Sequence, residues 1–361
     1  MKVAFIGNLG NFSYTTAKYL RKYGLDAHVF VLPGEVESIH SNPLHEDAFP
    51  NDVPPPWIHL WSGKSSLLRD YRFFKGFDII EAGTVLPLVL QFLVSDYVAY
   101  AHGSDLKEFA SRSSLTGYLQ RRAYRKARLI RFGDVTMLRW MEKFGLTRWQ
   151  FVPCIMDVDK YSSHPALSGE ASDGLPLSIL HPSRLDWTDT SGERLSIKRN
   201  DILIKAFARF VKDGHDAKLT LVDWGVDRRE TGGLIQHLDI ENHVTIVPKM
   251  KKSDLIRLYA NADVVADQFF IGSPGLVGFE GMSSGKPVLS YLDVECAKFC
   301  YEGDIPPVVN VKTEEDVYRQ LSELRDQSRR DSVGSDARQW MLKHHHGDVV
   351  ARRLLDIYRK L

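Results

Sequence analysis

Glycines and a carboxylate follow one another in the segment from Gly272 to Leu289. This segment follows an apolar run and opens a predicted helix at about Gly275. Glycines let a ligand approach the backbone closely, and the free N–H groups at a helix start favour a diphosphate. Glu280 lies about five residues into the helix, where it can accept hydrogen bonds from vicinal hydroxyls such as those of a ribose. We therefore predict that Ser273, Gly275, Leu276 and Glu280 bind a nucleotide diphosphate; a plain helix start with a solvated glutamate is the alternative.

A second candidate loop, Gly7-Asn8-Leu9-Gly10-Asn11, lies between an apolar run and a predicted helix. Counted from its first glycine, a dinucleotide fingerprint needs glycine at the third and sixth positions, which here hold Leu and Phe. A nicotinamide cofactor is therefore not expected. The N–H groups of the loop can approach an anion or a polar acceptor. A tight turn without a ligand is an equal alternative.

The segment around Glu280 resembles the retaining glycosyltransferases of the GT-B fold, family four, also called glycosyl transferases group 1. Glu280-Gly-Met-Ser-Ser-Gly-Lys-Pro-Val matches the second half of the motif in which two glutamates are separated by seven residues. The first glutamate, which in the family contacts the donor sugar, would fall at Gly272. We consider Asp267 and Gln268 as polar replacements.

A second match involves two cations. Arg184 in Pro-Ser-Arg-Leu-Asp and Lys198 before Arg-Asn-Asp-Ile-Leu-Ile-Lys-Ala-Phe correspond to family residues that grip the donor diphosphate. A forked guanidinium and an ammonium suit a leaving group that gains negative charge. Because the loop between them is long, Arg199 is the alternative to Lys198.

The resemblance implies further site residues. His102, in Tyr-Ala-His-Gly-Ser-Asp, lies where the family places a histidine near the transferred sugar; a core histidine is the alternative. Asp105 in the same segment is a candidate helix N-cap. Gly225 corresponds to a glycine whose backbone faces the nucleotide. The resemblance thus gives catalytic roles to Arg184, Lys198 and His102. The loop that contains Gly7, Asn8, Gly10 and Asn11 is the predicted acceptor-side loop.

These residues need a scaffold of strands that alternate with helices, which is typical of βαβ units and a parallel sheet. We predict two Rossmann-like, doubly wound α/β domains that face each other across a cleft. The predicted boundaries are 1–156 for the acceptor-side domain, 157–175 for a linker, 176–340 for the nucleotide-sugar domain and 341–361 for a helix that packs back on the first domain. Predicted strands are 2–7, 27–32, 78–83, 97–103, 128–132, 150–154, 177–182, 218–225, 243–249, 262–269, 286–292 and 306–311.

Composition excludes several other classes of protein. A chain of 361 residues exceeds one ordinary core, and 47 basic against 46 acidic residues give no global attraction to nucleic acid. Three cysteines without paired spacing indicate reduced thiols in a cytoplasmic protein. The apolar stretch from Val85 to Ala101 is interrupted by Pro87 and Asp96, which predicts a helix and then a strand rather than a membrane span.

A basic cluster lies on a predicted helix and in the residues that follow it. Contact with anionic lipid would place the protein at the inner face of a membrane. An ordinary solvated helix face is the favoured alternative. The cluster comprises Arg121, Arg122, Arg125, Lys126, Arg128 and Arg131.

The predicted function is retaining, metal-independent transfer of a sugar from a nucleotide-diphosphate donor, most simply a UDP-sugar, to a hydroxyl acceptor. The acceptor would be a sugar, a glycan or a lipid-linked glycan, as in polysaccharide biosynthesis, and no other cofactor is expected. A nucleotide-sugar epimerase of the same fold is the enzymatic alternative. A catalytically inactive nucleotide-sugar binder is the other, because of Gly272.

Overall fold

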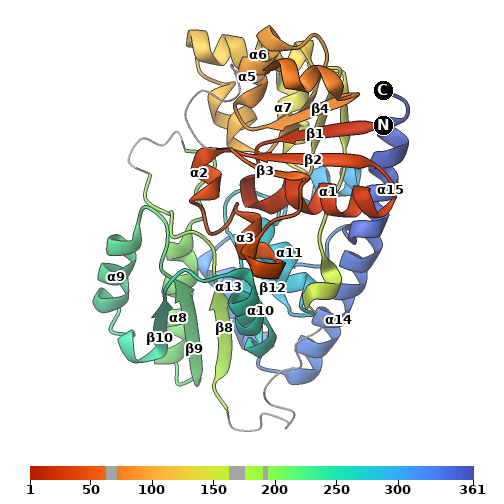
Figure 1. Ribbon diagram of the computed structural model, residues 1–361. Coiled ribbons are helices and arrows are strands. Elements are labelled where there is room, and N and C mark those ends of the chain that lie inside the picture. Colours follow the sequence, from red (N-terminus) through yellow and green to blue (C-terminus); the bar gives the residue numbers. More distant parts are fainter. Residues whose placement is uncertain (62–70, 162–174, 190–193) are drawn as a thin grey trace. The chain divides into compact units, whose positions relative to one another are not determined.

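The chain forms two compact units, shown in the computed structural model of Figure 1. The structure describes residues 1–61, 71–161, 175–189 and 194–361. The first unit contains Met1–Asp157, Lys251–Ser253 and His344–Leu361, and the second contains Val158–Met250 and Asp254–Lys343. Most of the linker predicted over 157–175 lies outside the described residues.

The first unit is built on a parallel sheet of seven strands in the order β3-β2-β1-β4-β5-β6-β7. The chain begins in the middle of the sheet and adds strands on one side and then on the other, which makes the sheet doubly wound. The order reverses between β1 and β4. The strands are β1 Lys2–Ile6, β2 Asp26–Val31, β3 Ile58–Leu60, β4 Ile79–Gly83, β5 Val98–Ala101, β6 Leu129–Phe132 and β7 Trp149–Phe151.

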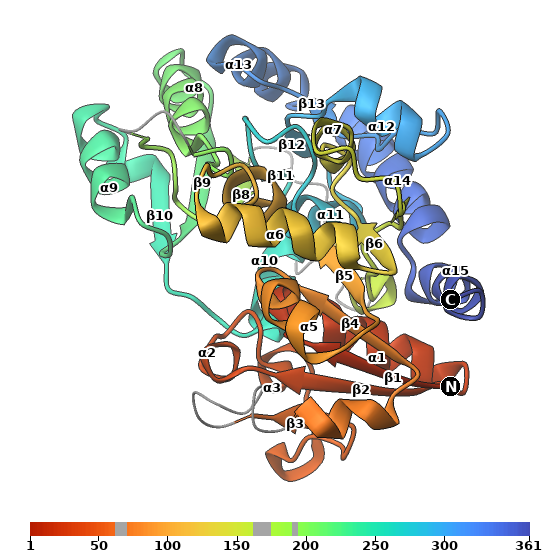
Figure 2. The same ribbon diagram turned by 90° about the horizontal axis from the view of Figure 1, so that it is seen from above.

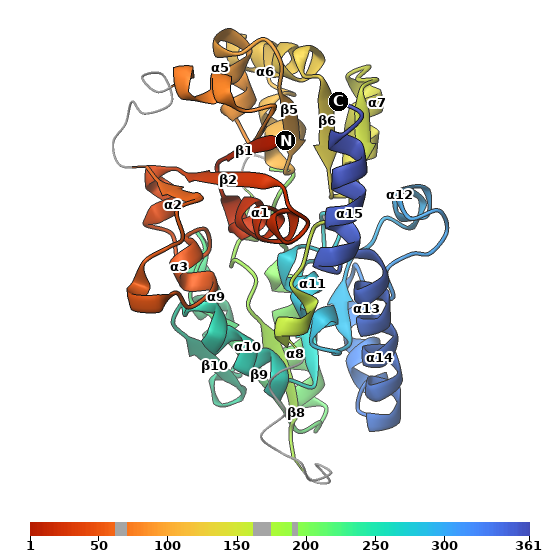
Figure 3. The same cartoon turned by 45° about the vertical axis from the view of Figure 1, so that its right-hand side comes forward.

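Helices far apart in the sequence cover this sheet together. Apolar residues of α1 and of the C-terminal α15 share one buried core with the strands, and the two helices lie side by side (Figure 3). Helix α1 ends where Gly24 adopts a φ of 83°, a left-handed conformation that favours glycine. The helices of this unit are α1 Phe12–Lys22, α2 Pro33–Val36, α3 Pro43–Glu46, α5 Leu86–Leu93, α6 Leu115–Lys126, α7 Met137–Lys143 and α15 Gly347–Tyr358.

The second unit repeats the doubly wound plan with six parallel strands in the order β10-β9-β8-β11-β12-β13. The order reverses between β8 and β11. The strands are β8 Leu177–His181, β9 Ala217–Val222, β10 Val244–Val247, β11 Val264–Ala266, β12 Val288–Ser290 and β13 Val309–Asn310.

The apolar face of α8 packs on this second sheet, and α13 lies beside α8 (Figure 2). The shared core includes Phe207, Phe210, Val317 and Leu321, all fully buried or nearly so. The helices are α8 Asn200–Lys212, α9 Arg228–His237, α10 Lys252–Asn261, α11 Leu276–Ser283, α12 Val294–Cys300, α13 Glu314–Glu323 and α14 Gln327–His344.

The predicted fold class of two doubly wound parallel-sheet domains is confirmed, and every predicted strand is present, most of them shortened. The sequence prediction missed β3, because its three residues follow a run of prolines that we interpreted as a loop. The stretch from Val85 forms α5 and then β5, as predicted. No helix in the described part of the chain combines the length and apolar character needed to cross a bilayer.

Candidate functional site

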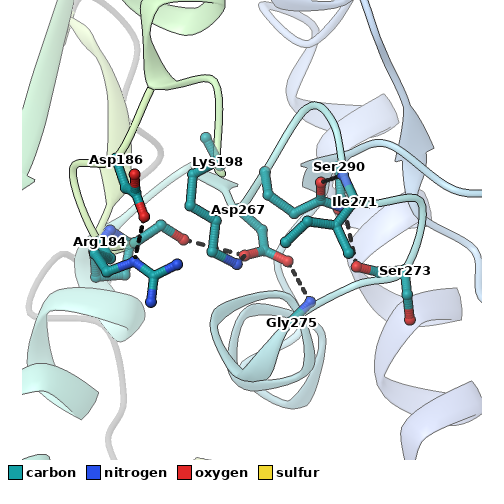
Figure 4. A network of polar contacts seen from close by, with 12 residues as sticks. Arg184, Asp186, Lys198, Asp267, Ile271, Ser273, Gly275 and Ser290 are labelled. Carbon is teal, nitrogen blue, oxygen red and sulfur yellow. Dashed lines mark hydrogen bonds and ion pairs between the residues drawn. The ribbon is translucent and has the colours of Figure 1, made fainter. Parts of the chain in front are cut away.

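Charged side chains gather beyond the carboxyl ends of β8 and β11 in the second unit (Figure 4). Arg184 follows β8, Asp267 follows β11, and Lys198 precedes α8. Gly275 is the N-cap of α11. Because β8 and β11 are neighbours at the point where the strand order reverses, their carboxyl ends border the crevice in which doubly wound sheets bind ligands.

Asp267 lies at the centre of this cluster. Its side chain is fully buried, and its Oδ2 accepts a hydrogen bond of 2.5 Å from the backbone N of Gly275. Its Oδ1 accepts from Ser183 Oγ at 3.1 Å and lies 3.8 Å from Lys198 Nζ. The carboxylate of Asp267 therefore contacts Ser183, Lys198 and the start of α11 at the same time.

Lys198, and not the alternative Arg199, belongs to the cluster. A Cβ placed on Gly275 would lie 3.3 Å from Lys198 Nζ, so the ammonium lies next to the start of α11. Arg199 instead pairs with Asp201 through Nε at 2.9 Å and Nη2 at 3.2 Å. The structure thus decides between the two residues that the long loop had left open.

Arg184 is held by a carboxylate and a backbone oxygen. Its Nε lies 3.0 Å from Asp186 Oδ2, and its Nη2 donates to Ser196 O at 3.0 Å. The Nη2 of Arg194 reaches the other oxygen of the same carboxylate, Oδ1, at 2.5 Å. Sequence reasoning missed Arg194 and Asp186. The only signal for Asp186 was its place two residues after Arg184, and for Arg194 there was none.

A buried histidine shapes the turn that presents Arg184. His181 Nδ1 lies 2.8 Å from Ala266 O, and its Nε2 lies 2.6 Å from Asn200 Nδ2, so Nδ1 carries the proton and Nε2 accepts. Asn200 in turn accepts from the backbone N of Asp186 at 2.7 Å. Burial lowers the pKa of His181 to about 4, which keeps the ring neutral. Side-chain hydrogen bonds from His181 and Asn200 therefore fix the turn that carries Arg184.

The loop between β11 and α11 is fixed by Gln268. This fully buried amide accepts from the N–H groups of Phe270 and Ile271 and donates to Ser273 O at 2.9 Å. Asp267 and Gln268 were considered as sugar-binding replacements for the missing glutamate. Both side chains are buried and bonded inside the unit in the free protein, and a sugar-binding role for them stays a prediction.

Gly272, at the position of the missing glutamate, adopts a φ of 87°. Side chains other than glycine rarely adopt this left-handed conformation. The next residue, Ser273, is 3% exposed, and its hydroxyl has no hydrogen-bond partner among the described residues. The backbone here is therefore built for glycine, and a buried hydroxyl remains for a ligand that reaches the loop.

Glu280 lies in the second turn of α11, four residues after Leu276, the first residue of the helix. It is 2% exposed, and its Oε2 accepts from the hydroxyl of Tyr259 at 2.8 Å. Burial raises the pKa of Tyr259 well above its ordinary value, and the Glu280 carboxylate raises it further. The tyrosine thus remains a hydrogen-bond donor to Glu280.

Gly225 has a structural reason to be glycine. A Cβ there would lie 2.2 Å from the backbone O of Leu185, and its φ is 119°. Next to it, Trp224 donates from Nε1 to Pro182 O at 2.8 Å. These contacts bring the loop after β9 against the Arg184 turn.

His102 lies in the first unit, in a small pocket at the carboxyl ends of the strands. Its ring packs edge-on against Tyr100, with centroids 4.4 Å apart, and lies tilted against the ring of Phe12. Burial and, to a smaller extent, the nearby Arg131 lower its pKa to about 3. The ring is therefore a neutral hydrogen-bonding group. The other lining residues are Ser13, Thr16, Glu81, Gly83, Arg131 and Ile155.

Asp105 organises the backbone at His102 instead of capping a following helix. Its two oxygens accept from the N–H groups of His102, at 3.1 Å, and Gly103, at 2.7 Å. The hydroxyl of Tyr124 donates to it at 2.7 Å. Because a helix N-cap accepts from residues that follow it, the N-cap interpretation of Asp105 was wrong.

The first loop bonds largely to its own unit. The backbone N of Gly7 donates to Phe30 O, and that of Asn8 to Glu35 Oε1 at 2.7 Å. Gly10 N donates to Ser41 Oγ at 3.2 Å, and Asn11 N to the carbonyl of Asn8. The tight-turn interpretation accounts for all of these bonds, and the acceptor role of the loop stays a prediction.

The basic cluster is split between α6 and the residues after it. Arg131 is on β6 and buried, where it pairs with Glu81. Arg128 pairs with Asp96 at 2.9 Å. These two arginines of the basic cluster therefore pair with acidic residues away from α6, and α6 itself carries Arg121, Arg122, Arg125 and Lys126.

Known proteins share this architecture. Residues 190–340 match the family model described as glycosyl transferases group 1. No curated protein matches the sequence. Among solved structures, HepE of Anabaena in complex with UDP and glucose is 17% identical with a TM-score of 0.73, and each chain is covered in full.

Two further solved structures share the fold. The sucrose-phosphate synthase of Thermosynechococcus elongatus is 16% identical with a TM-score of 0.70, covering 100% of this chain and 99% of that one. WaaG, a glycosyltransferase involved in lipopolysaccharide biosynthesis, is 14% identical with a TM-score of 0.65, covering 99% of both chains. The matched residues make the second unit a glycosyl transferases group 1 domain, and this chain is a glycosyltransferase of the GT-B fold.

Proposed function

We propose that the protein transfers a sugar from a UDP-sugar to a hydroxyl acceptor, with retention of the anomeric configuration and without a metal ion. The observation that carries the proposal is that the ammonium of Lys198 lies at the start of α11, beyond β11, while Arg184 follows the neighbouring strand β8 (Figure 4). A guanidinium, an ammonium and a helix N-terminus together suit a diphosphate leaving group. UDP is favoured as the nucleotide because HepE of Anabaena, which shares the fold, binds it.

The second unit supplies the residues for leaving-group departure. Arg184 and Lys198 contact the diphosphate oxygens. The hydroxyl of Ser273 and the N–H of Leu276 bind the same group, and Gly275, whose own N–H is donated to Asp267, lets it approach the helix start. Glu280 accepts from the ribose hydroxyls. As the bond between the anomeric carbon and the diphosphate breaks, its electron pair goes to the phosphate oxygen, and the carbon gains oxocarbenium character. Positive groups held in place by Asp267 and Asp186 need no rearrangement when that charge develops.

The acceptor hydroxyl attacks from the side that the diphosphate leaves, so the configuration is retained. Its oxygen bonds to the anomeric carbon, and its proton goes to the departing phosphate oxygen. His102, which its environment keeps neutral, contributes a hydrogen bond to the sugar and not a proton to the reaction. Within the described ranges, no group of three or more His, Cys, Asp or Glu is arranged as metal ligands.

The decisive experiment uses the purified protein with a panel of UDP-, GDP- and ADP-sugars. Thermal stabilisation identifies the nucleotide, and NMR of the product formed with hydroxyl acceptors gives its anomeric configuration. We expect an acceptor-dependent product with retained configuration that forms equally well in EDTA. Donor conversion without an acceptor would identify an epimerase. Binding without turnover across the acceptors would identify the inactive binder that Gly272 suggests.

We further propose that the acceptor is a glycan precursor at an anionic membrane surface on the cytoplasmic side, as in polysaccharide assembly. The support is one face of α6, where Leu115 is 73% and Tyr118 is 54% exposed and the basic residues follow one to two turns later. On the neighbouring α5, Phe92 is 63% exposed, with the guanidinium of Arg122 over its ring at 5.5 Å. Co-sedimentation with phosphatidylglycerol vesicles tests this proposal, and equal binding to neutral phosphatidylcholine vesicles or none to either would contradict it.

A further inference from the structure

Asp267 brings a negative charge to a place where a diphosphate is expected. The carboxylate is 0% exposed, and its oxygens face the hydroxyl of Ser183, the ammonium of Lys198 and the N–H of Gly275. A Cβ on Gly278 would lie 2.9 Å from Asp267 Oδ2, so two glycines at the start of α11 make room for the carboxylate. The group is thus built into the helix start and is not a surface acid that happens to be near.

The same groups are those proposed to hold the diphosphate of the donor. The Lys198 ammonium and the Asp267 carboxylate lie 3.3 Å and 3.2 Å, respectively, from where a Cβ of Gly275 would be, so both charges border the first residue of the helix start (Figure 4). A diphosphate that approaches Lys198 therefore also approaches the carboxylate. At such separations in a partly buried site, repulsion between like charges is substantial.

We propose that Asp267 is a positioning residue that acts as a resident counter-charge of the donor site. It fixes Lys198 and the start of α11 in the free protein, and its repulsion weakens the grip on the nucleoside diphosphate that remains after transfer. Binding that is equally strong in the ground state and the transition state does not accelerate chemistry. A counter-charge that weakens the binding of the nucleoside diphosphate therefore lets this product leave faster. This inference rests on the proposed function.

The first test compares UDP binding and turnover in the wild type and in Asp267→Asn. The amide keeps the size of the carboxylate but loses its charge, so we expect the Kd for UDP by calorimetry to fall by three- to tenfold. We expect kcat to fall by at least threefold, because UDP leaves more slowly. A purely structural role predicts weaker binding together with lower turnover. An unchanged or raised Kd in the folded variant overturns the inference.

A matched control removes the same charge elsewhere in the unit. Asp213 lies at the other end of α8, a helix of 13 residues, and bonds to the hydroxyl of Tyr318. Thirteen residues separate the two ends by about 20 Å. Asp213→Asn should leave the Kd for UDP within twofold of the wild type. A change in Kd as large as that of Asp267→Asn would show that only the net charge of the protein matters, and would overturn the inference.

The second test removes both partners of the ion pair and does not depend on the folding of the single Asp267 variant. Lys198→Met leaves the carboxylate unopposed, so the Kd for UDP should rise by more than thirtyfold. Adding Asp267→Asn to it should lower the Kd again by at least fivefold. A double variant that binds UDP no better than Lys198→Met overturns the inference.

Failure of the inference differs from failure of the proposed function. If the wild type binds GDP or ADP instead of UDP, the same variants are measured with that nucleotide. If it binds none of the three, the proposed function fails and the inference fails with it. If the wild type binds and transfers while the Asp267 variants do not behave as described, only the counter-charge role is rejected.

Discussion

Individual residues at the carboxyl ends of β8 and β11 have roles that their neighbours do not share. The ammonium of Lys198 lies next to the start of α11, whereas the adjacent Arg199 forms a two-pronged ion pair with Asp201. Arg184 and Arg194 share the carboxylate of Asp186. Adjacent cations of the same charge are therefore expected to differ sharply in what they contribute to transfer.

Arg184→Ala should lower kcat about 100-fold, because one such electrostatic contact to a developing charge is worth about 3 kcal/mol. Steady-state kinetics with the UDP-sugar identified by the thermal screen measures this change. Arg199→Ala is the matched control and should keep kcat within twofold. Equal turnover in both variants and the wild type would show that Arg184 does not stabilise the departing diphosphate.

Glu280→Gln should raise the Kd for UDP about tenfold while the protein keeps its melting temperature. The amide oxygen can still accept from Tyr259, but the amide nitrogen then faces the ribose in place of an acceptor oxygen. Calorimetry with UDP measures the change. A Kd within twofold of the wild type would show that Glu280 only supports Tyr259.

At the scale of elements, glycines decide how closely loops approach one another. The loop after β9 touches the Arg184 turn because Gly225 has no side chain, and the β11–α11 loop turns at Gly272 with a φ of 87°. In both loops the backbone conformation, and not a missing ligand contact, explains the glycine. The loop after β9 therefore supports the turn that carries Arg184, and the β11–α11 loop leads into the helix start next to Lys198.

Gly225→Ala should destabilise the second unit by about 3 kcal/mol, because its Cβ would overlap the backbone of Leu185 at a positive φ. Thermal unfolding measures the loss. The control is Gly233→Ala in α9, where nothing lies within 4 Å of the new Cβ, and which should stabilise the helix by about 0.5–1 kcal/mol. Equal effects in the two variants would contradict the role of close approach.

At the scale of the whole molecule, three buried neutral histidines make stability depend on pH. Burial lowers the pKa of His102 and His345 to about 3 and that of His181 to about 4. The first two lie in the first unit and the third in the second. In the unfolded chain each would titrate near 6.5, so below that pH the unfolded state takes up protons that the folded state does not.

The contribution of these histidines is fully present above pH 6.5 and is lost as the pH falls from 6.5 toward 4. At pH 5.5 each should cost about 1.4 kcal/mol of stability. Urea unfolding at pH 7.5 and 5.5 measures the loss, and His345→Asn should make the dependence of the first unit shallower. Stability that does not change over this range would show that the rings are accessible to protons.

The sequence by itself determined the alternation of strands and helices, the two parallel sheets and the start of α11 near Gly275, because these depend on local apolar periodicity and on glycine. It missed β3, whose three residues are too few for a pattern. Only the tertiary structure decided between Lys198 and Arg199 and placed the charge of Asp267 at the start of α11. It also showed that Arg131 of the basic cluster is buried in an ion pair with Glu81. Ion pairs such as these join residues up to 69 positions apart, and their partners are set by which strand ends become neighbours in the sheet, for which no local pattern exists.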